Sequence, residues 1–381
     1  MNGLSLYDYV VEVCANCRCG KCLDACPIYR VVRREGVSPR GKLKIIHAYL
    51  KGEIPPSKSL LENTAYCALC LACEAQCGVN KLTSTRISMG EIIPSFRYDL
   101  IKNGYELPQY KSIMETILRT GNIFGEGGCR DIYQQAHGKN VEVIHWVGCI
   151  ASFKRESTST SINNILSKLK VSFKPLINTC CGYPLYQVGY WKHLEDIAER
   201  NVEAIKSLDS NMLVSSCPAC IGFIRDFYPK IIGERLPFRV KHISEMLQEY
   251  VKSGELKLDV RDENIAVAYH DPCHLSRYLN IYDQPRDIMK SLNINIVEME
   301  KGRLETECCG GGIRLALPEI STTIAAQRVL TIPKDVDYLI TSCPTCTVNL
   351  NDGVYVAKVL YDFNIDVKVM DLAELINQFI K

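Results

Sequence analysis

The apolar residues in the last two thirds of the chain follow two alternating patterns. Short continuous apolar runs of strand length recur, and segments with helical spacing follow some of them. The strand-like runs are 141–147, 212–214, 238–240, 265–269, 338–340 and 365–369, and the clearest helical segments are 243–251 and 372–380. Strands that alternate with helices are typical of α/β units. We therefore predict an α/β fold here, with its chemistry at strand ends.

These elements occur twice because the whole segment is repeated. Each copy contains a single cysteine, a Cys-Cys-Gly group and a Cys-Pro-x-Cys group. The first cassette is Cys149, Cys180, Cys181, Cys217 and Cys220, and the second is Cys273, Cys308, Cys309, Cys343 and Cys346. Matching cysteines are 124 to 128 residues apart, which indicates two copies of one unit.

The first third of the chain has helical spacing. Residues 1–13 lead into a cysteine group, and a helix is predicted to begin after Ser38 as N-cap, with Pro39 in its first turn. Residues 98–118 are also predicted to be helical, followed by a glycine-rich connection at 121–128. The predicted organisation is a helical domain at 1–105, a linker at 106–140, and two α/β domains at 141–262 and 263–381.

The composition is that of a soluble globular protein with two or three domains. The chain has 381 residues, 47% of them hydrophobic and 23% charged, and its net charge of +2 gives no reason to expect nucleic acid. No apolar run reaches the ~18 to 20 residues of a membrane span, and residues 1–9 lack the regions of a secretory signal. We expect a cytoplasmic protein, with peripheral docking on a membrane subunit left open.

The twenty cysteines of the chain are more than an ordinary globular protein of this size has. A chain of this size can bury a core without disulfides, so cysteines in tight groups favour metal ligation. Cys67, Cys70, Cys73 and Cys77 have the C-x2-C-x2-C-x3-C spacing of bacterial ferredoxins, in which the fourth cysteine ligates the neighbouring cluster. We therefore expect the first three to share a cubane [4Fe-4S] cluster with Cys26, and Cys77 to complete a second cubane.

The other N-terminal group departs from this spacing. It contains Cys14, Cys17, Cys19, Cys22 and Cys26, and the position expected for its first ligand is Asn16. A small loop adjustment could deliver Cys14 or Cys17, so one thiol is spare and the spacing leaves open which. Cys129 lies outside every group and is expected to be an ordinary thiol. The basic residues between the two groups predict a solvated face, with docking of an acidic partner as the alternative: Arg30, Arg33, Arg34, Arg40, Lys42 and Lys44.

Each repeated cassette supplies five thiolates, whereas a cubane or a structural zinc needs four. Adjacent residues in an extended chain point to opposite sides, so each Cys-Cys pair is expected to hold different irons of an open cluster. Gly182 and Gly310 permit the unusual backbone angles of such a loop, and Pro218 and Pro344 stiffen it. A zinc site built from both Cys-Pro-x-Cys groups would leave the Cys-Cys pairs unexplained. The run 310–312 lacks the lysine of a phosphate loop, so close approach to a cluster explains its glycines better.

The motifs around these cysteines resemble one family. Residues 179–185 (TCCGYPL), 270–274 (HDPCH) and 307–312 (ECCGGG) are similar to motifs of the CCG domains of the heterodisulfide reductase family. The resemblance covers nearly the whole chain. Its order, a helical ferredoxin-like part and then two CCG domains related by an approximate twofold axis, looks like that of a fused catalytic subunit that pairs with a membrane cytochrome b. Iron–sulfur subunits of glycolate, lactate and anaerobic glycerol-3-phosphate dehydrogenases have a similar order.

The resemblance implies two activities. In the reductases each complete cassette holds a noncubane [4Fe-4S] cluster, and a small disulfide is cleaved to two thiols between the two clusters. In the dehydrogenase subunits the cassettes are often incomplete, and the role is electron relay from an FAD-containing subunit to quinone. Both cassettes are complete here, so we predict a disulfide reductase with two cubane and two noncubane clusters, and keep the relay as the alternative.

Two histidines flank Cys273 in the resembling motif. His270 and His274 are candidate acids for releasing the thiols, because an unperturbed imidazole titrates close to neutral pH. The alternative is that one of them orients the cluster loop through a backbone hydrogen bond. Tyr183 and Tyr278 are weaker candidates for the lining of the site.

Overall fold

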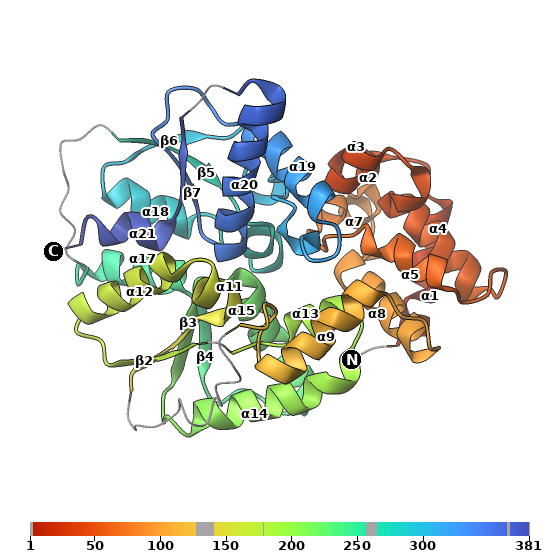
Figure 1. Ribbon diagram of the computed structural model, residues 1–381, viewed down its shortest axis with the longest axis horizontal. Coiled ribbons are helices and arrows are strands. Elements are labelled where there is room, and N and C mark those ends of the chain that lie inside the picture. Colours follow the sequence, from red (N-terminus) through yellow and green to blue (C-terminus); the bar gives the residue numbers. More distant parts are fainter. Residues whose placement is uncertain (1–2, 127–140, 178, 257–264, 364–365, 381) are drawn as a thin grey trace.

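The N-terminal region of the chain is entirely helical. The structure is a computed structural model that describes residues 3–126, 141–177, 179–256, 265–363 and 366–380. Figure 1 shows this region, in red and orange, packed against one end of the rest. Its helices are α1 (Asp8–Asn16), α2 (Lys21–Ala25), α3 (Pro27–Val32), α4 (Pro39–Leu50), α5 (Lys58–Ala65), α6 (Ala72–Ala75), α7 (Gly78–Leu82), α8 (Met89–Lys102) and α9 (Pro108–Thr120).

Two sequence predictions for this region have different outcomes. The cap of α4 is confirmed, because the Ser38 hydroxyl accepts a hydrogen bond from the backbone N–H of Gly41 at 2.9 Å. The continuous helix over 98–118 is wrong, since α8 ends at Lys102 and α9 begins at Pro108. Between them Gly104 has φ of +88°, a left-handed conformation that ends a helix. Cys129 lies outside the described residues.

The first α/β unit follows. Its elements are β1 (Val143–Trp146), α11 (Gly148–Phe153), α12 (Glu156–Lys168), β2 (Phe173–Leu176), α13 (Tyr183–Val188), α14 (Leu194–Lys206), β3 (Met212–Ser215), α15 (Pro218–Asp226), α16 (Tyr228–Ile232), β4 (Arg239–His242) and α17 (Ile243–Ser253). The predicted strands at 141–147, 212–214 and 238–240 correspond to β1, β3 and β4. Strand β2 was not predicted.

The second α/β unit repeats most of these elements. They are β5 (Ala266–His270), a π-helical turn (His274–Tyr278), α18 (Gln284–Ser291), β6 (Asn295–Glu298), α19 (Pro318–Val329), β7 (Tyr338–Thr341), α20 (Pro344–Tyr361), β8 (Lys368–Asp371) and α21 (Leu372–Asn377). Three predicted strands are again found, as β5, β7 and β8, and β6 was not predicted.

Both units have the same sheet topology. Each sheet has four parallel strands, in the orders β2-β1-β3-β4 and β6-β5-β7-β8. In each unit the second strand lies on one side of the first strand, and the third strand lies on the other side of it. The carboxyl ends of β1 and β3, and of β5 and β7, therefore flank a topological switch point, where open α/β sheets bind ligands.

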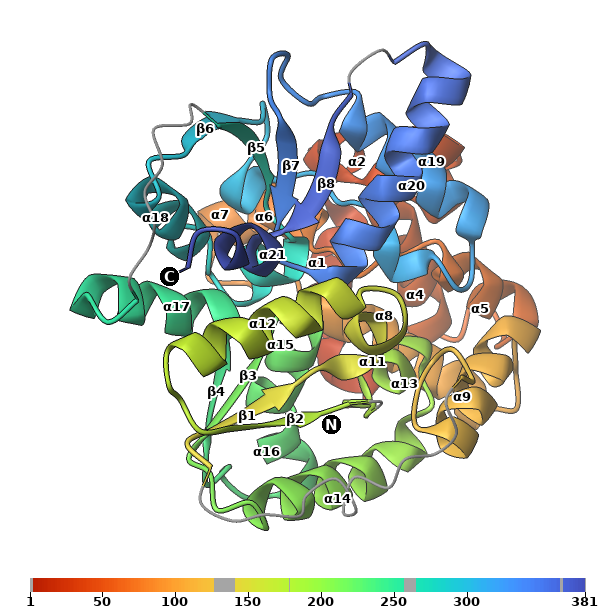
Figure 2. The same ribbon diagram turned by 60° about the vertical axis from the view of Figure 1, so that its left-hand side comes forward.

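The two units share a hydrophobic core. Helix α12 of the first unit packs against α21 of the second, and α17 packs against α18. Figure 2 shows α12, α17 and α21 between the two sheets. An early helix of the first unit therefore packs against the last helix of the second, and the last helix of the first against an early helix of the second. Such an exchange is what a twofold axis would produce, and the axis itself stays a prediction.

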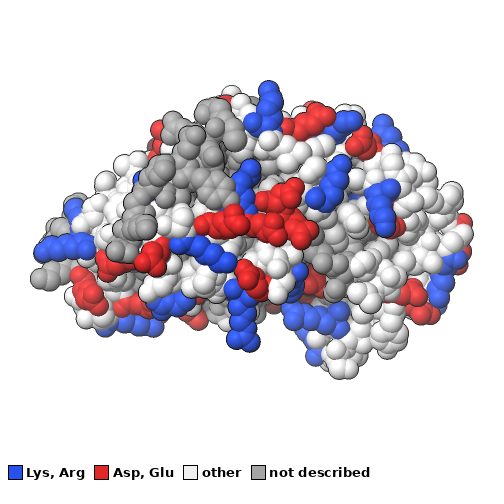
Figure 3. All heavy atoms as spheres, turned by 90° about the horizontal axis from the view of Figure 1, so that it is seen from below, with Lys and Arg blue, Asp and Glu red and all other residues white. Residues whose placement is uncertain are grey.

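Charge is mixed over the surface. Figure 3 shows acidic and basic side chains interspersed on the lower face, with one group of acidic side chains near its centre. This distribution agrees with the small net charge of the chain. Among the described residues, no helix is both long enough and apolar enough to span a membrane.

Candidate metal centres

The ten cysteines of the two cassettes surround one cavity of about 230 Å³. They reach it from the carboxyl ends of strands. Cys149 and Cys217 follow β1 and β3 in the first unit, and Cys273 and Cys343 follow β5 and β7 in the second. The Cys-Cys pairs follow the edge strands β2 and β6. The expectation that the cysteines lie at strand ends is confirmed, because parallel strands bring their carboxyl ends to one edge.

The proline of each Cys-Pro-x-Cys group begins a helix. Cys217 is the N-cap of α15 and Cys343 is the N-cap of α20, with Pro218 and Pro344 in the first turn. Proline is favoured there because the first helical N–H has no partner within the helix. The second cysteine of each group then lies in the first helical turn. The helix dipole favours negative charge at this end, so it stabilises a thiolate there.

The glycine after each Cys-Cys pair is required by the backbone. Gly182 has φ of +86° and Gly310 has φ of +84°, in the left-handed region that glycine tolerates best. Space is also short, since a Cβ on Gly310 would lie 2.6 Å from the carbonyl oxygen of Ser321. Gly312 has a different role from the one expected, because a Cβ there would lie 2.6 Å from the carbonyl oxygen of Ala68. It allows the N-terminal region to pack on the second unit.

The N-terminal cysteines line two smaller cavities. One, of about 30 Å³, is bordered by Cys14, Cys17, Cys19, Cys22, Cys73 and Cys77. The other, of about 20 Å³, is bordered by Cys26, Cys67, Cys70 and Cys73. This grouping matches the expected exchange of Cys26 and Cys77 between two sites, although Cys73 borders both cavities. The ligand assignments themselves stay predictions, as does the identity of the spare thiol.

The donor set fits iron–sulfur clusters. All 19 described cysteines are free. Burial, and then the charges of neighbouring cysteines, raise the pKa of Cys14 and of Cys149 each to about 12. Such crowded thiols cannot all be thiolates at neutral pH unless cations lie among them. Iron supplies that charge, and thiolate is its usual ligand in clusters.

The predicted basic patch is not a uniform solvated face. Lys42 is buried and donates a hydrogen bond to the carbonyl of Val37, so it is removed from the surface. Burial lowers the pKa of its amino group, and the nearby Cys67 and Cys26 oppose this lowering. Arg30 forms an ion pair with Glu307 of the second unit. These residues therefore serve internal contacts near the cysteines.

His274 lies on the large cavity with Tyr183. Its Nε2 is 2.7 Å from the Tyr183 hydroxyl, and its Nδ1 is 3.4 Å from the sulfur of Cys273. Its ring stacks on Tyr278, with centroids 4.7 Å apart. Burial lowers the pKa of His274, but the charge and hydrogen bond of Cys273 outweigh burial and leave the pKa raised. Tyr278 thus supports the imidazole from behind and is not among the residues lining the cavity.

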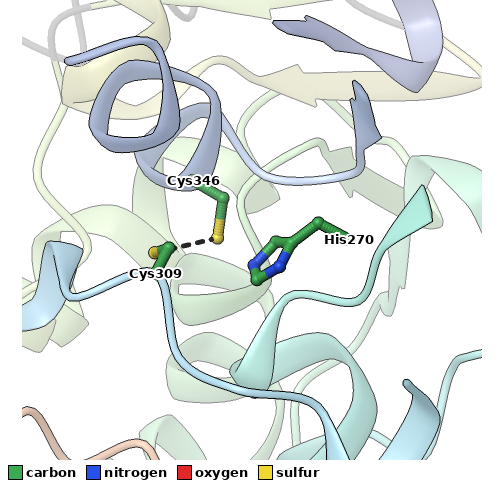
Figure 4. A group of neighbouring side chains, drawn as sticks. All are labelled: His270, Cys309 and Cys346. Atoms are coloured by element: carbon green, nitrogen blue, oxygen red, sulfur yellow. Dashed lines mark hydrogen bonds between the residues drawn. The ribbon is translucent and has the colours of Figure 1, made fainter. Parts of the chain in front are cut away.

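His270 is not among the residues that line the cavity. It is 1% exposed, and Figure 4 shows it beside Cys309 and Cys346. One ligand atom of each lies within 4.8 Å of the others, and the two sulfurs are 3.3 Å apart. Nδ1 of His270 accepts a hydrogen bond from Nε of Arg328 at 3.3 Å. The neutral ring therefore carries its proton on Nε2.

Three arginines were missed by the sequence reasoning, two of them buried (Arg97 and Arg286) and one partly buried (Arg277). Arg97 donates to the backbone carbonyls of Thr64, Cys67 and Gln187. Arg277 donates to the carbonyls of Cys70 and Thr306, each at 2.6 Å. Arg286 forms two hydrogen bonds with Asp271, at 2.7 and 2.8 Å. Each of them holds a cysteine-bearing loop to another segment of the chain.

Comparison with known families identifies the repeated units. The model of the cysteine-rich domain, CCG, matches residues 143–225 and 267–351. The chain contains two cysteine-rich domains. The matched residues lie within the two α/β units and include all ten cysteines of the cassettes.

Relatives extend the similarity beyond the cysteine-rich domains. A subunit of the dihydromethanophenazine:CoB–CoM heterodisulfide reductase of Methanosarcina mazei is 28% identical, over 96% of this chain and 94% of that protein. The EtfAB:quinone oxidoreductase of Syntrophomonas wolfei is 28% identical over 63% of this chain and 34% of that protein. The chain is therefore homologous to this heterodisulfide reductase component over most of its length.

A solved structure shares the fold. A hypothetical protein from Helicobacter pylori covers 98% of this chain with a TM-score of 0.57 and 12% identity, and the match spans 75% of that protein. At this identity the likeness concerns the fold alone.

Proposed function

We propose that this chain is an iron–sulfur oxidoreductase subunit that reduces a small disulfide to two thiols. The S–S bond of the substrate breaks, two electrons enter one at a time from a redox partner, and two protons complete the thiols. The partner is a membrane cytochrome b or an FAD-containing subunit. The observation that carries the proposal is the single cavity shared by both cysteine cassettes.

The arrangement of the two cassettes on one cavity supports substrate chemistry over relay alone. The N-terminal cysteine groups line cavities of only about 30 and 20 Å³. The ten cysteines of the cysteine-rich domains instead line one cavity of about 230 Å³, with both cassettes on its wall. A disulfide held there is within reach of both cassettes, so each of its sulfur atoms can face a different one. The clusters of both cassettes would border this same cavity, so the support comes from the facing of the two cassettes and not from the volume.

The residues proposed to hold the clusters form four sets. The noncubane sites are Cys149, Cys180, Cys181, Cys217 and Cys220, and Cys273, Cys308, Cys309, Cys343 and Cys346. The cubane sites are Cys26, Cys67, Cys70 and Cys73, and Cys77 with three of Cys14, Cys17, Cys19 and Cys22. The bound clusters supply one-electron transfer.

The sets are arranged for transfer between neighbours. The Cys70 side chain lies in one buried cluster with that of Cys308, and the Cys308 thiol lowers the pKa of Cys70 to about 7. Arg277 joins the backbone of Cys70 to that of Thr306. The Cys-Cys pair of the second cysteine-rich domain thus lies close to the N-terminal cysteines.

The chain offers a proton at the cavity wall. His274 is hydrogen bonded to the Tyr183 hydroxyl, and both residues line the cavity. Tyr183 is buried, and burial keeps its pKa well above the ordinary value, so its hydroxyl stays protonated. The pair can therefore hold a proton beside a thiolate product. His270 does not border the cavity, so we assign the proton to His274.

The alternative is an electron-relay subunit of a flavin-dependent 2-hydroxy acid or glycerol 3-phosphate dehydrogenase. The similarity to the EtfAB:quinone oxidoreductase favours it. In that role the subunit would pass electrons from the flavin subunit to quinone. No disulfide would then react at the cavity.

The deciding experiment is reoxidation of the reduced protein. Anaerobically purified chain with roughly 16 irons, four per cluster, is reduced with viologen and mixed with a panel of small disulfides. We expect one disulfide to reoxidise it rapidly, with loss of the reaction in Cys309→Ser. If no disulfide reacts while a quinone analogue does, the relay is correct.

A second measurement tests the proton donor. His274→Gln and Tyr183→Phe are expected to lower disulfide turnover at least tenfold while iron content stays at the wild-type level. Tyr190→Phe is the matched control, because its hydroxyl is bonded to Glu106 outside the cavity. Loss of iron in His274→Gln would instead assign that residue to holding the Cys273 loop.

A further inference from the structure

The last residue of the first strand of each cysteine-rich domain carries a ring nitrogen. Trp146 ends β1 three residues before Cys149, and His270 ends β5 three residues before Cys273. The two residues are therefore equivalent in the repeat. Their rings differ in chemistry, but indole Nε1 and imidazole Nε2 can both donate a hydrogen bond.

The indole of Trp146 has an unused donor. The side chain is fully buried, and its Nε1 has no hydrogen-bond partner among the described residues. Buried donors are almost always paired, so an orphan of this kind indicates a group that is absent from the structure. An indole nitrogen can only donate, so that group must be an acceptor.

The position of this donor indicates the acceptor. A point placed as a Cβ on Gly148 would lie 3.4 Å from the sulfur of Cys220 and 3.8 Å from Nε1 of Trp146. The indole nitrogen and a sulfur of the first cassette thus border the same small space. In the second domain His270 lies in the same relation to Cys309 and Cys346, with Arg328 on its Nδ1 (Figure 4).

We propose that Trp146 donates an N–H···S hydrogen bond to the iron–sulfur site of the first cysteine-rich domain and thereby raises its reduction potential. The inference rests on the proposed cluster sites. Hydrogen bonds to sulfur stabilise the extra negative charge of a reduced cluster, and they are a known determinant of cluster potential. His270 takes the equivalent place in the second domain. Trp146 is a positioning and tuning residue that does not touch substrate.

The first test is a redox titration followed by EPR. In Trp146→Phe, which keeps an aromatic ring and removes the N–H, we expect the midpoint potential of one site to fall. A tenfold change in the one-electron equilibrium corresponds to about 59 mV. The matched control is Trp191→Phe, whose indole donates to the carbonyl of Tyr186 at 3.0 Å and should leave every potential unchanged. Trp146→His, which copies the second domain, should recover part of the loss.

Unchanged potentials in Trp146→Phe with full iron content would overturn the proposal. If that variant loses iron, the hydrogen bond is tested instead in the wild-type protein labelled with ¹⁵N in its indoles. Pulsed EPR is then expected to show coupling of one indole nitrogen to a paramagnetic site, and the coupling should persist in Trp191→Phe. Its absence would refute the hydrogen bond. The iron content of the wild type and its reoxidation by disulfide report separately on the proposed function.

Discussion

The buried ion pair between Arg286 and Asp271 offers a direct test of how the second cysteine cassette is held. Both side chains are about 1% exposed, and the guanidinium also pairs with the half-exposed Glu298. Arg286→Met leaves the Asp271 carboxylate buried without its charged partner. Removing one partner of a buried pair costs ~3–5 kcal/mol. Asp271 is two residues before Cys273, so the loop carrying this cysteine should loosen as well.

The expected loss can be converted to a melting temperature. An unfolding entropy of ~2.1 cal/mol/K per residue gives about 0.8 kcal/mol/K for the whole chain, so the loss corresponds to roughly 4–6 °C. Anaerobic thermal unfolding measures this shift, and iron analysis should show roughly 12 irons where the wild type has roughly 16. Lys206→Met, which breaks an exposed pair with Glu234, should cost less than ~1 kcal/mol.

The first cysteine-rich domain shows which apolar residues can replace the ion pair in a variant that restores stability. At the positions 124 residues earlier the first domain has Val147 and Ile162, both buried. A buried ion pair replaced by apolar residues is often neutral. Asp271→Val with Arg286→Ile should therefore recover most of the stability lost in Arg286→Met. A single variant that melts within about 1 °C of the wild type, or a double variant no better than the single one, would refute the reasoning.

Two further predictions follow from the described geometry. Burial lowers the pKa of His145 from 6.5 to about 4. Its contribution to stability is complete above pH 6.5 and should decline as the pH falls toward 4, so unfolding midpoints should depend less on pH in His145→Leu; parallel curves would exclude this. Of the serine variants of Cys14, Cys17, Cys19 and Cys22, one should keep the full iron content, and a loss of iron in all four would mean that no thiol is spare.

The interior strands, and β4 and β8 at one edge of each sheet, could be predicted from sequence, whereas β2 and β6 at the other edge could not. β1, β3, β5 and β7 are largely buried and appear in the sequence as continuous apolar runs. β2 contains Lys174 and Pro175, and β6 begins at Asn295 and ends at Glu298. Of the eight residues in these two strands, only one is buried. β2 and β6 are too exposed to show a hydrophobic pattern, so the repeat alone could have located them.

The spatial grouping of the cysteines could be predicted from sequence, because spacing determines which thiols share a turn and parallel strands bring their ends together. The contacts that hold those turns could not. Arg97 reaches Cys67 across 30 residues and Arg277 reaches Cys70 across 207. Such pairs depend on how separate segments pack, which has no local pattern. The same reason explains why Lys42, expected on a basic face, is buried.

The exchange of helices between the cysteine-rich domains has a consequence for how the protein is made. Thr158 near the start of α12 hydrogen bonds with Glu374 of α21, which is synthesised 216 residues later. At ~5–20 residues per second, a ribosome needs on the order of 10 to 40 s to bridge that interval. Throughout this time the apolar face of α12 lacks the cover that α21 provides. The first domain therefore reaches its final packing only after the second has emerged.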